Sequence, residues 1–85
     1  MDSVKAFKEK LDQEHNWPTD YMFKFVVPSD KEEEVEKEFP SEDMKKRLSK
    51  AGNYIAFTFK KMINDSDEVV DIYKRARKIE GLIAL

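Results

Sequence analysis

The chain has 85 residues, of which 40% are hydrophobic and 40% are charged, and its formal net charge is −2. This length suits one domain with a thin core, and one Trp, three Tyr and six Phe argue against disorder. The absence of a Lys and Arg excess argues against a nucleic-acid-binding protein, and the absence of Cys excludes disulfides, thiolate chemistry and Cys-based zinc sites.

Charged residues interrupt the stretch from Met1 to Leu11, so we expect no signal peptide there. No stretch approaches the roughly 20 consecutive apolar residues that span a bilayer. The sequence therefore predicts a cytoplasmic protein that does not contact a membrane.

The first predicted element is an amphipathic helix from Ser3 to Glu14, since Val4, Phe7 and Leu11 recur at helical spacing. Trp17-Pro18 ends this segment. We expect residues 1–19 to form an N-terminal helix and linker, and residues 20–85 to form the main domain.

A strand is predicted from Asp20 to Val27, where aromatic and β-branched residues dominate and Pro28 closes the run. Ser29 is the predicted cap of a short helix, whose first turn is rich in Glu. Val35 and Phe39 give this helix its apolar stripe, and Pro40 stops it.

The stretch from Met44 to Lys50 has two interpretations. A Ser41 cap and Gly52 as terminator favour a short helix, in which Met44 and Leu48 lie four residues apart. As a strand, it would place Met44, Lys46, Leu48 and Lys50 on one face and Lys45, Arg47 and Ser49 on the other. We predict a strand, because the fold described below needs one here.

The remaining elements give clearer signals. After a turn at residues 51–53, the alternation from Asn53 to Ile63 predicts a second strand. Ser66 is the predicted cap of a helix that ends at Gly81. The apolar stripe of this helix consists of Val69, Ile72, Tyr73, Ala76 and Ile79. The tail from Leu82 to Leu85 fits a short strand.

After the N-terminal helix, this order is β-α-β-β-α-β. It predicts an α+β, ferredoxin-like sandwich with a four-stranded antiparallel sheet and two helices on one face, plus the N-terminal helix. The more hydrophobic strand positions should face the helices: Phe23, Phe25, Ile55, Phe57 and Phe59.

The opposite face of the sheet, here called the open face, is mixed in character. Its predicted members are Met22, Lys24, Val26, Tyr54, Ala56, Thr58 and Lys60. Such a surface is often covered by a dimer mate, an extra helix or a ligand. We expect the N-terminal helix to lay Val4, Phe7 and Leu11 near this sheet with Trp17 at its rim; the alternative is a loosely attached helix.

Several segments together resemble the YbeD-like family of small bacterial proteins of uncharacterised function. They are Trp17-Pro18 leading into Asp20–Pro28, Ser49–Tyr54, Asp71–Lys74 and Ile79–Leu85. The resemblance covers roughly residues 16–85. It implies a ferredoxin-like fold similar to ACT-type regulatory domains, which bind small effectors and associate through their sheets, and hence a regulatory role.

No set of residues predicts an active site, so we expect no enzymatic activity, no metal and no cofactor. His15 is the sole histidine and is expected to be a solvated residue at a helix end. The acidic residues between Glu32 and Glu38 spread around a helix and do not converge as metal ligands do. The segment from Pro28 to Lys31 lacks the arginine that acylphosphatase-like enzymes need after their first strand.

Two functions remain open. The leading one is a regulatory or interaction module that meets a protein partner, or a second copy of itself, through Met22, Lys24, Tyr54, Ala56, Thr58 and Lys60. The alternative is an RNA-binding domain on the same face, although nucleic acid is disfavoured by the net charge and by Tyr54 being the one aromatic residue there. Lys24 and Lys60 could hold an anionic partner, or could be charges that keep an exposed sheet soluble.

Overall fold

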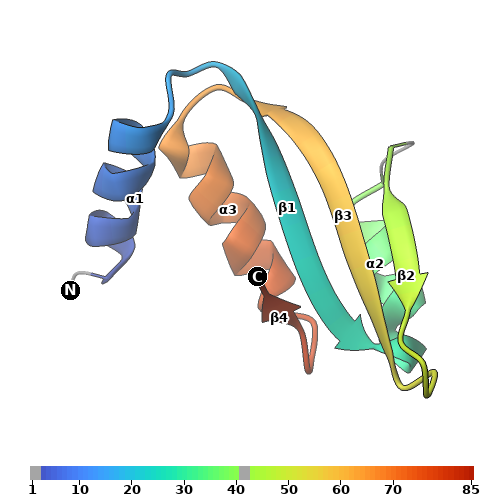
Figure 1. Cartoon of the computed structure of the whole chain (residues 1–85). Helices are drawn as coiled ribbons and strands as arrows, with labels where there is room; N and C mark the ends of the chain where they lie inside the picture. The colour runs from blue at the N-terminus through green and yellow to red at the C-terminus, as the bar shows by residue number, and fades with distance from the viewer. Residues whose placement is uncertain (1–2, 41–42) are drawn as a thin grey trace.

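The computed structural model describes residues 3–40 and 43–85 and contains the predicted elements in order (Figure 1). The elements are α1 (Ser3–Glu14), β1 (Thr19–Pro28), a 3-10 turn η1 (Ser29–Lys31), α2 (Glu32–Glu38), β2 (Lys45–Leu48), β3 (Tyr54–Ile63), α3 (Ser66–Ala76) and β4 (Ile83–Ala84). None of the helices in these described ranges has the length and apolar character needed to cross a bilayer.

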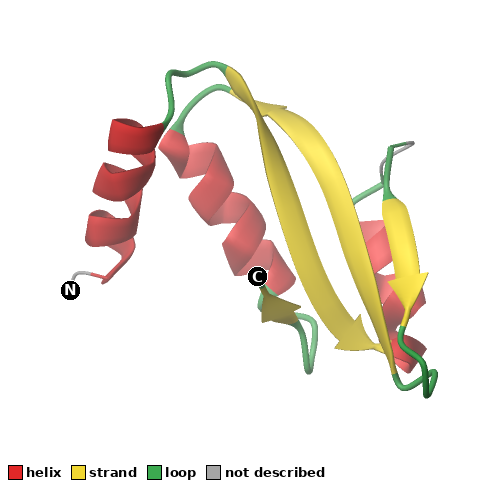
Figure 2. Ribbon diagram, viewed as in Figure 1, coloured by secondary structure: helices red, strands yellow, loops and turns green. Residues whose placement is uncertain are grey.

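The four strands form one antiparallel sheet in the order β2-β3-β1-β4 (Figure 2). With α2 between β1 and β2 and α3 between β3 and β4, this is the predicted ferredoxin-like arrangement. The long strands β1 and β3 form its centre, and they pair along their whole length from Thr19–Ile63 to Pro28–Tyr54. The two short strands lie at the edges.

The stretch from Met44 to Lys50, which the sequence allowed as helix or strand, contains a strand, as predicted. Lys45–Leu48 pairs with β3 in the register Lys45–Thr58 to Leu48–Ile55. Pairing with β3 outweighs the local helical preference, because a tertiary partner supplies hydrogen bonds that an isolated segment lacks. The suggested helix cap, Ser41, lies outside the described residues.

Two predicted helix caps differ from the structure. The N-cap of α3 is Asp65, whose side chain accepts a hydrogen bond from the Glu68 amide, while Ser66 is buried as the first helical residue. Asp and Ser are similarly favoured as N-cap residues, so the sequence alone does not show which of two neighbouring residues, Asp65 or Ser66, is the cap. Ser29 lies within η1, and no side chain caps η1 or α2.

The core lies between the sheet and the helices, and it contains the phenylalanines that the alternation assigned to this side. Phe23, Phe25 and Phe57 are fully buried. Rings from β1, β3 and the end of α2 form a connected cluster, with centroid separations of 5.2 Å for Phe23–Phe59 and 5.6 Å for Phe25–Phe39. Aromatic contacts of this kind hold α2 and α3 on the same face of the sheet.

The N-terminal helix packs beside α3, and not over the open face (Figure 1). Phe7 meets the Tyr73 ring edge-on at 5.6 Å, Lys8 forms an ion pair with Asp67, and Leu11 joins the core with 3% exposure. Of the residues expected near the sheet, Leu11 reaches the core, but α1 lies beside α3 and does not cover the open face. These contacts argue against the alternative of a loosely attached helix. The half-buried side of α3 offers an apolar surface that the cationic sheet face does not.

Candidate functional site

The strand register brings most of the predicted surface residues into one neighbourhood. Met22 lies opposite Lys60, Lys24 opposite Thr58, and Val26 opposite Ala56. Directly opposed residues on antiparallel strands share a face, so these side chains all lie on the side away from the helices. Met22, Lys24 and Lys60 are exposed, whereas Ala56 and Thr58 are half-buried.

Tyr54 is also on this face but lies at its other end. It pairs with Pro28, four positions along β3 from Thr58. Four strand residues span roughly 13 Å, so Tyr54 does not adjoin Lys24 and Lys60 as the alternation alone suggested. Lys24 and Lys60 are themselves diagonal neighbours, because Lys60 lies two residues beyond Thr58 on the same strand.

Three lysines surround Thr58, and we call them the lysine cluster: Lys24, Lys45 and Lys60. Lys24 on β1 and Lys45 on β2 both lie directly opposite Thr58, one on each side. Two strand spacings put their backbones about 10 Å apart. Each lysine is exposed, and the three ammonium groups can converge on one anion above the Thr58 hydroxyl.

The sequence interpretation missed the contribution of β2 to this face. Lys45 and Arg47 pair with Thr58 and Ala56, which places both cations on the open side. The signal was present in the alternation of residues 44–50, but the register with β3 was needed to assign a face to it. With these two residues, the open side of the four strands carries four cations and one carboxylate, that of Asp20.

A shallow hollow of about 470 Å³ adjoins the lysine cluster. Its lining includes Lys45, Thr58 and Lys60, together with Met22, Met44, Phe59 and Asp43. Apolar and cationic side chains therefore line the same depression, together with one acidic residue, Asp43. That combination suits a ligand that carries both a carboxylate and a hydrophobic group.

Lys8 and Lys46, which lie on the helix side of the molecule, form ion pairs, unlike the lysines of the cluster. Lys46 Nζ donates to Glu32 at 2.9 Å and also to Glu36, and these carboxylates raise the pKa of Lys46 to about 12. Lys8 pairs with Asp67, which raises the pKa of that lysine too. Within residues 3–40 and 43–85, no ion pair involves Lys24, Lys45, Arg47 or Lys60.

The other polar residues considered by sequence have structural surroundings. His15 is half-buried at the end of α1, with its ring 5.3 Å from the rings of both Trp17 and Tyr21, so it is not simply solvated. Glu38 accepts a 2.6 Å hydrogen bond from Arg75 Nε and links α2 to α3. Among the described residues, no three His, Cys, Asp or Glu side chains gather in a group that could hold a metal ion.

Comparison with known proteins identifies a family. The sequence profile described as "Protein of unknown function (DUF493)" matches residues 12–85, so the chain belongs to that family. The YbeD-like resemblance is a resemblance to this same family. No curated protein and no solved structure matches the chain.

Proposed function

We propose that this member of the DUF493 family is a non-catalytic regulatory module that binds an acidic segment of a partner protein on its open sheet face. The observation that carries the proposal is the lysine cluster of Lys24, Lys45 and Lys60 around Thr58. These cations form no ion pair within the described chain, while Lys46 on the opposite side of β2 has two carboxylate partners.

Electrostatics favours an anionic partner at this position. Like charges within about one Debye length repel one another, and an incoming carboxylate relieves that repulsion while gaining attraction to each ammonium group. The same charge arrangement opposes a symmetric face-to-face dimer, because it would place two cationic surfaces against each other. A second copy of the chain is therefore a weaker candidate for this face than an acidic partner.

Apolar residues around the cluster favour a protein over a nucleic acid. Met22 is 46% exposed, and Met62 and Ile83 are also exposed on the open face. Methionine adapts its shape to irregular protein surfaces. Single-stranded RNA is usually held by several stacked aromatic residues, whereas Tyr54 is the one aromatic side chain on the open side of the described strands and lies roughly 13 Å along β3 from Thr58.

Solution binding with two matched probes tests the proposal. One probe is a labelled Glu-rich peptide with interspersed leucines, and the other is single-stranded RNA of the same net charge. We expect the peptide to bind more tightly, with an affinity that falls as salt is raised. Amide shifts in ¹H–¹⁵N NMR spectra should centre on Lys24, Lys45 and Thr58.

A triple Lys→Gln variant at Lys24, Lys45 and Lys60 should weaken peptide binding about tenfold, since exposed ion pairs contribute roughly 0.5 kcal/mol each. The control is Lys→Gln at Lys5, Lys10 and Lys78, which are exposed and removed from the open face. Equal loss in both variants would mean that net charge alone drives binding. Tighter binding of RNA would favour the alternative function, and a concentration-dependent dimer mapped to this face would favour self-association.

A further inference from the structure

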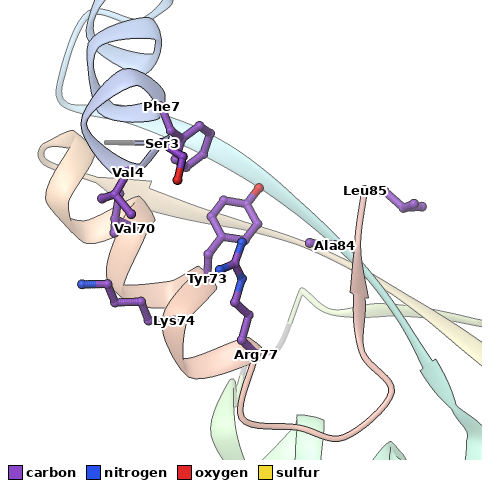
Figure 3. Close-up of a pocket in the computed structure, with 9 residues that line it drawn as sticks. All are labelled: Ser3, Val4, Phe7, Val70, Tyr73, Lys74, Arg77, Ala84 and Leu85. Carbon is purple, nitrogen blue, oxygen red and sulfur yellow. The ribbon is translucent and has the colours of Figure 1, made fainter. Parts of the chain in front are cut away.

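A second cavity lies on the helix side of the molecule, between α1, α3 and the C-terminal strand (Figure 3). Its volume is about 350 Å³, which falls in the range of small-molecule sites. Val4 and Phe7 of α1 form one wall, Val70 and Tyr73 of α3 form the facing wall, and Ala84 belongs to the third side. The lining is therefore mostly apolar.

The apolar residues of α1 beside this cavity are incompletely covered. Leu11 anchors the helix in the core, but Val4 is 47% exposed and Phe7 36% exposed, although both point toward α3 (Figure 3). An apolar group in the cavity would remove these surfaces from water without moving the backbone. This half of α1 is the part of the helix that an occupant would contact.

Two cations, Lys74 and Arg77, give the cavity its charge. Neither forms an ion pair within the described residues, whereas Arg75 between them is held by Glu38. The Arg77 side chain runs alongside Tyr73 within the cavity, while Lys74 points outward (Figure 3). No Asp or Glu side chain lines the cavity among the described residues, and none of their ion pairs involves Arg77.

Tyr73 adds a hydroxyl group to the same region. Burial, together with a hydrogen bond to Tyr21, raises the pKa of Tyr73 above its ordinary value. The phenol therefore keeps its proton at physiological pH and remains uncharged. A neutral hydroxyl beside a guanidinium group presents no negative charge to an incoming anion.

We propose that this cavity binds a small monocarboxylate with an apolar body, whose carboxylate lies on the Arg77 guanidinium and whose body lies between α1 and Val70. The planar guanidinium matches a carboxylate with two parallel hydrogen bonds. The inference is independent of the proposed function, because the lysine cluster lies on the opposite side of the sheet.

The test uses 3-phenylpropanoate as the probe and its neutral isostere 3-phenylpropanamide as the matched control, each titrated into the whole ¹⁵N-labelled chain. We expect saturable amide shifts at Phe7, Tyr73 and Ala84 with the acid, and at least tenfold weaker binding of the amide. Arg77→Gln should weaken binding of the acid at least tenfold. Lys78→Gln, which removes the same charge one residue away from the cavity lining, should leave it unchanged.

Three results would overturn this inference: no saturable shift at millimolar probe, equal affinity for acid and amide, or shifts that centre on Thr58. The last result would place the acid at the lysine cluster. Because the acid and amide are compared on the unaltered chain, the test holds even if a variant loses stability. Failure here leaves the peptide-binding proposal intact, since that proposal is read out at Lys24, Lys45 and Thr58.

Discussion

The turn before β4 allows a sharp test of the packing, because two glycines with similar positive φ angles lie in different surroundings. Gly81 has φ of 83° and Gly52 has φ of 78°. A Cβ atom at Gly81 would lie 2.8 Å from Cγ and 3.0 Å from Cδ of Pro28, while a Cβ at Gly52 would have nothing within 4 Å. Gly52→Ala therefore isolates the backbone cost, and Gly81→Ala adds a steric clash to it.

The expected magnitudes follow from these surroundings. An alanine at positive φ costs roughly 1–2 kcal/mol, which is our expectation for Gly52→Ala. At Gly81 the rigid proline ring cannot rotate away, so overpacking adds about 1–3 kcal/mol. For a domain of this size, 1 kcal/mol shifts Tm by roughly 4–8 °C, so the two variants should be clearly separated in thermal unfolding.

The assay is thermal and urea unfolding followed by circular dichroism, for both variants alone and in a Pro28→Ala background. Removing the ring should recover most of the extra cost at Gly81 and none of the cost at Gly52. Equal destabilisation by the two glycine substitutions, or no coupling to Pro28, would refute the close approach of this turn to the end of β1.

Three further outcomes test other contacts. Leu11→Ala should lower the free energy of unfolding by about 3 kcal/mol, because Leu11 is buried in the core. An unchanged urea unfolding curve would contradict the packing of α1 against the core. Asp65→Ala should lower the free energy of unfolding by about 1 kcal/mol, because it removes the N-cap of α3, and the helical circular dichroism signal should be lost at a lower temperature. Ser66→Gly is the control, and an equal effect of that variant would contradict the assignment of the cap to Asp65. The carboxylates of Glu36 and Glu32 raise the pKa of Lys46 from 10.5 to about 12. The contribution of this ion pair to folding stability is therefore complete below pH 10.5 and is lost as the pH rises through 12. In urea unfolding, the Lys46→Met variant should lose less stability than the unaltered chain between these pH values.

The alternation of residue types was enough to predict the two central strands and their inner faces. Phe23 and Phe25 on one strand, and Phe57 and Phe59 on the other, repeat every second residue, and a strand can bury such a set on one side only. The residues between them, Lys24 and Thr58, then fall on the opposite side. This local rule also gave Met22, Lys24 and Lys60 their common face.

The position of α1 could not be obtained in the same way. The spacing of Val4, Phe7 and Leu11 shows that one side of the helix is apolar, but it does not say which apolar surface that side meets. The answer depends on Tyr73 of α3, more than sixty positions away from Phe7 in the chain, whose ring completes the contact. The apolar stripe of one helix does not indicate which surface of the protein it packs against.

The acidic run of α2 shows the same limit for charges. Its glutamates looked solvated because their partners are distant in sequence: Lys46 for Glu32 and Glu36, and Arg75 for Glu38. Side chains on a strand alternate between faces, so Lys46 reaches α2 while its neighbours Lys45 and Arg47 cannot. Of these three consecutive basic residues, Lys46 therefore pairs with α2, while Lys45 and Arg47 lie on the open face.

This division bears directly on the open face. Glu32 and Glu36 of α2 are engaged by Lys46, whose pKa of about 12 keeps it charged under all ordinary conditions. Glu32 and Glu36 are thus held on the helix side of the strand and are not available to neutralise Lys45 and Arg47 across its edge. The open face keeps its positive charge although the whole chain is net negative. The net charge argued against a nucleic acid, but it does not exclude an anionic protein partner, because the cations of the strands are concentrated on one face of the sheet.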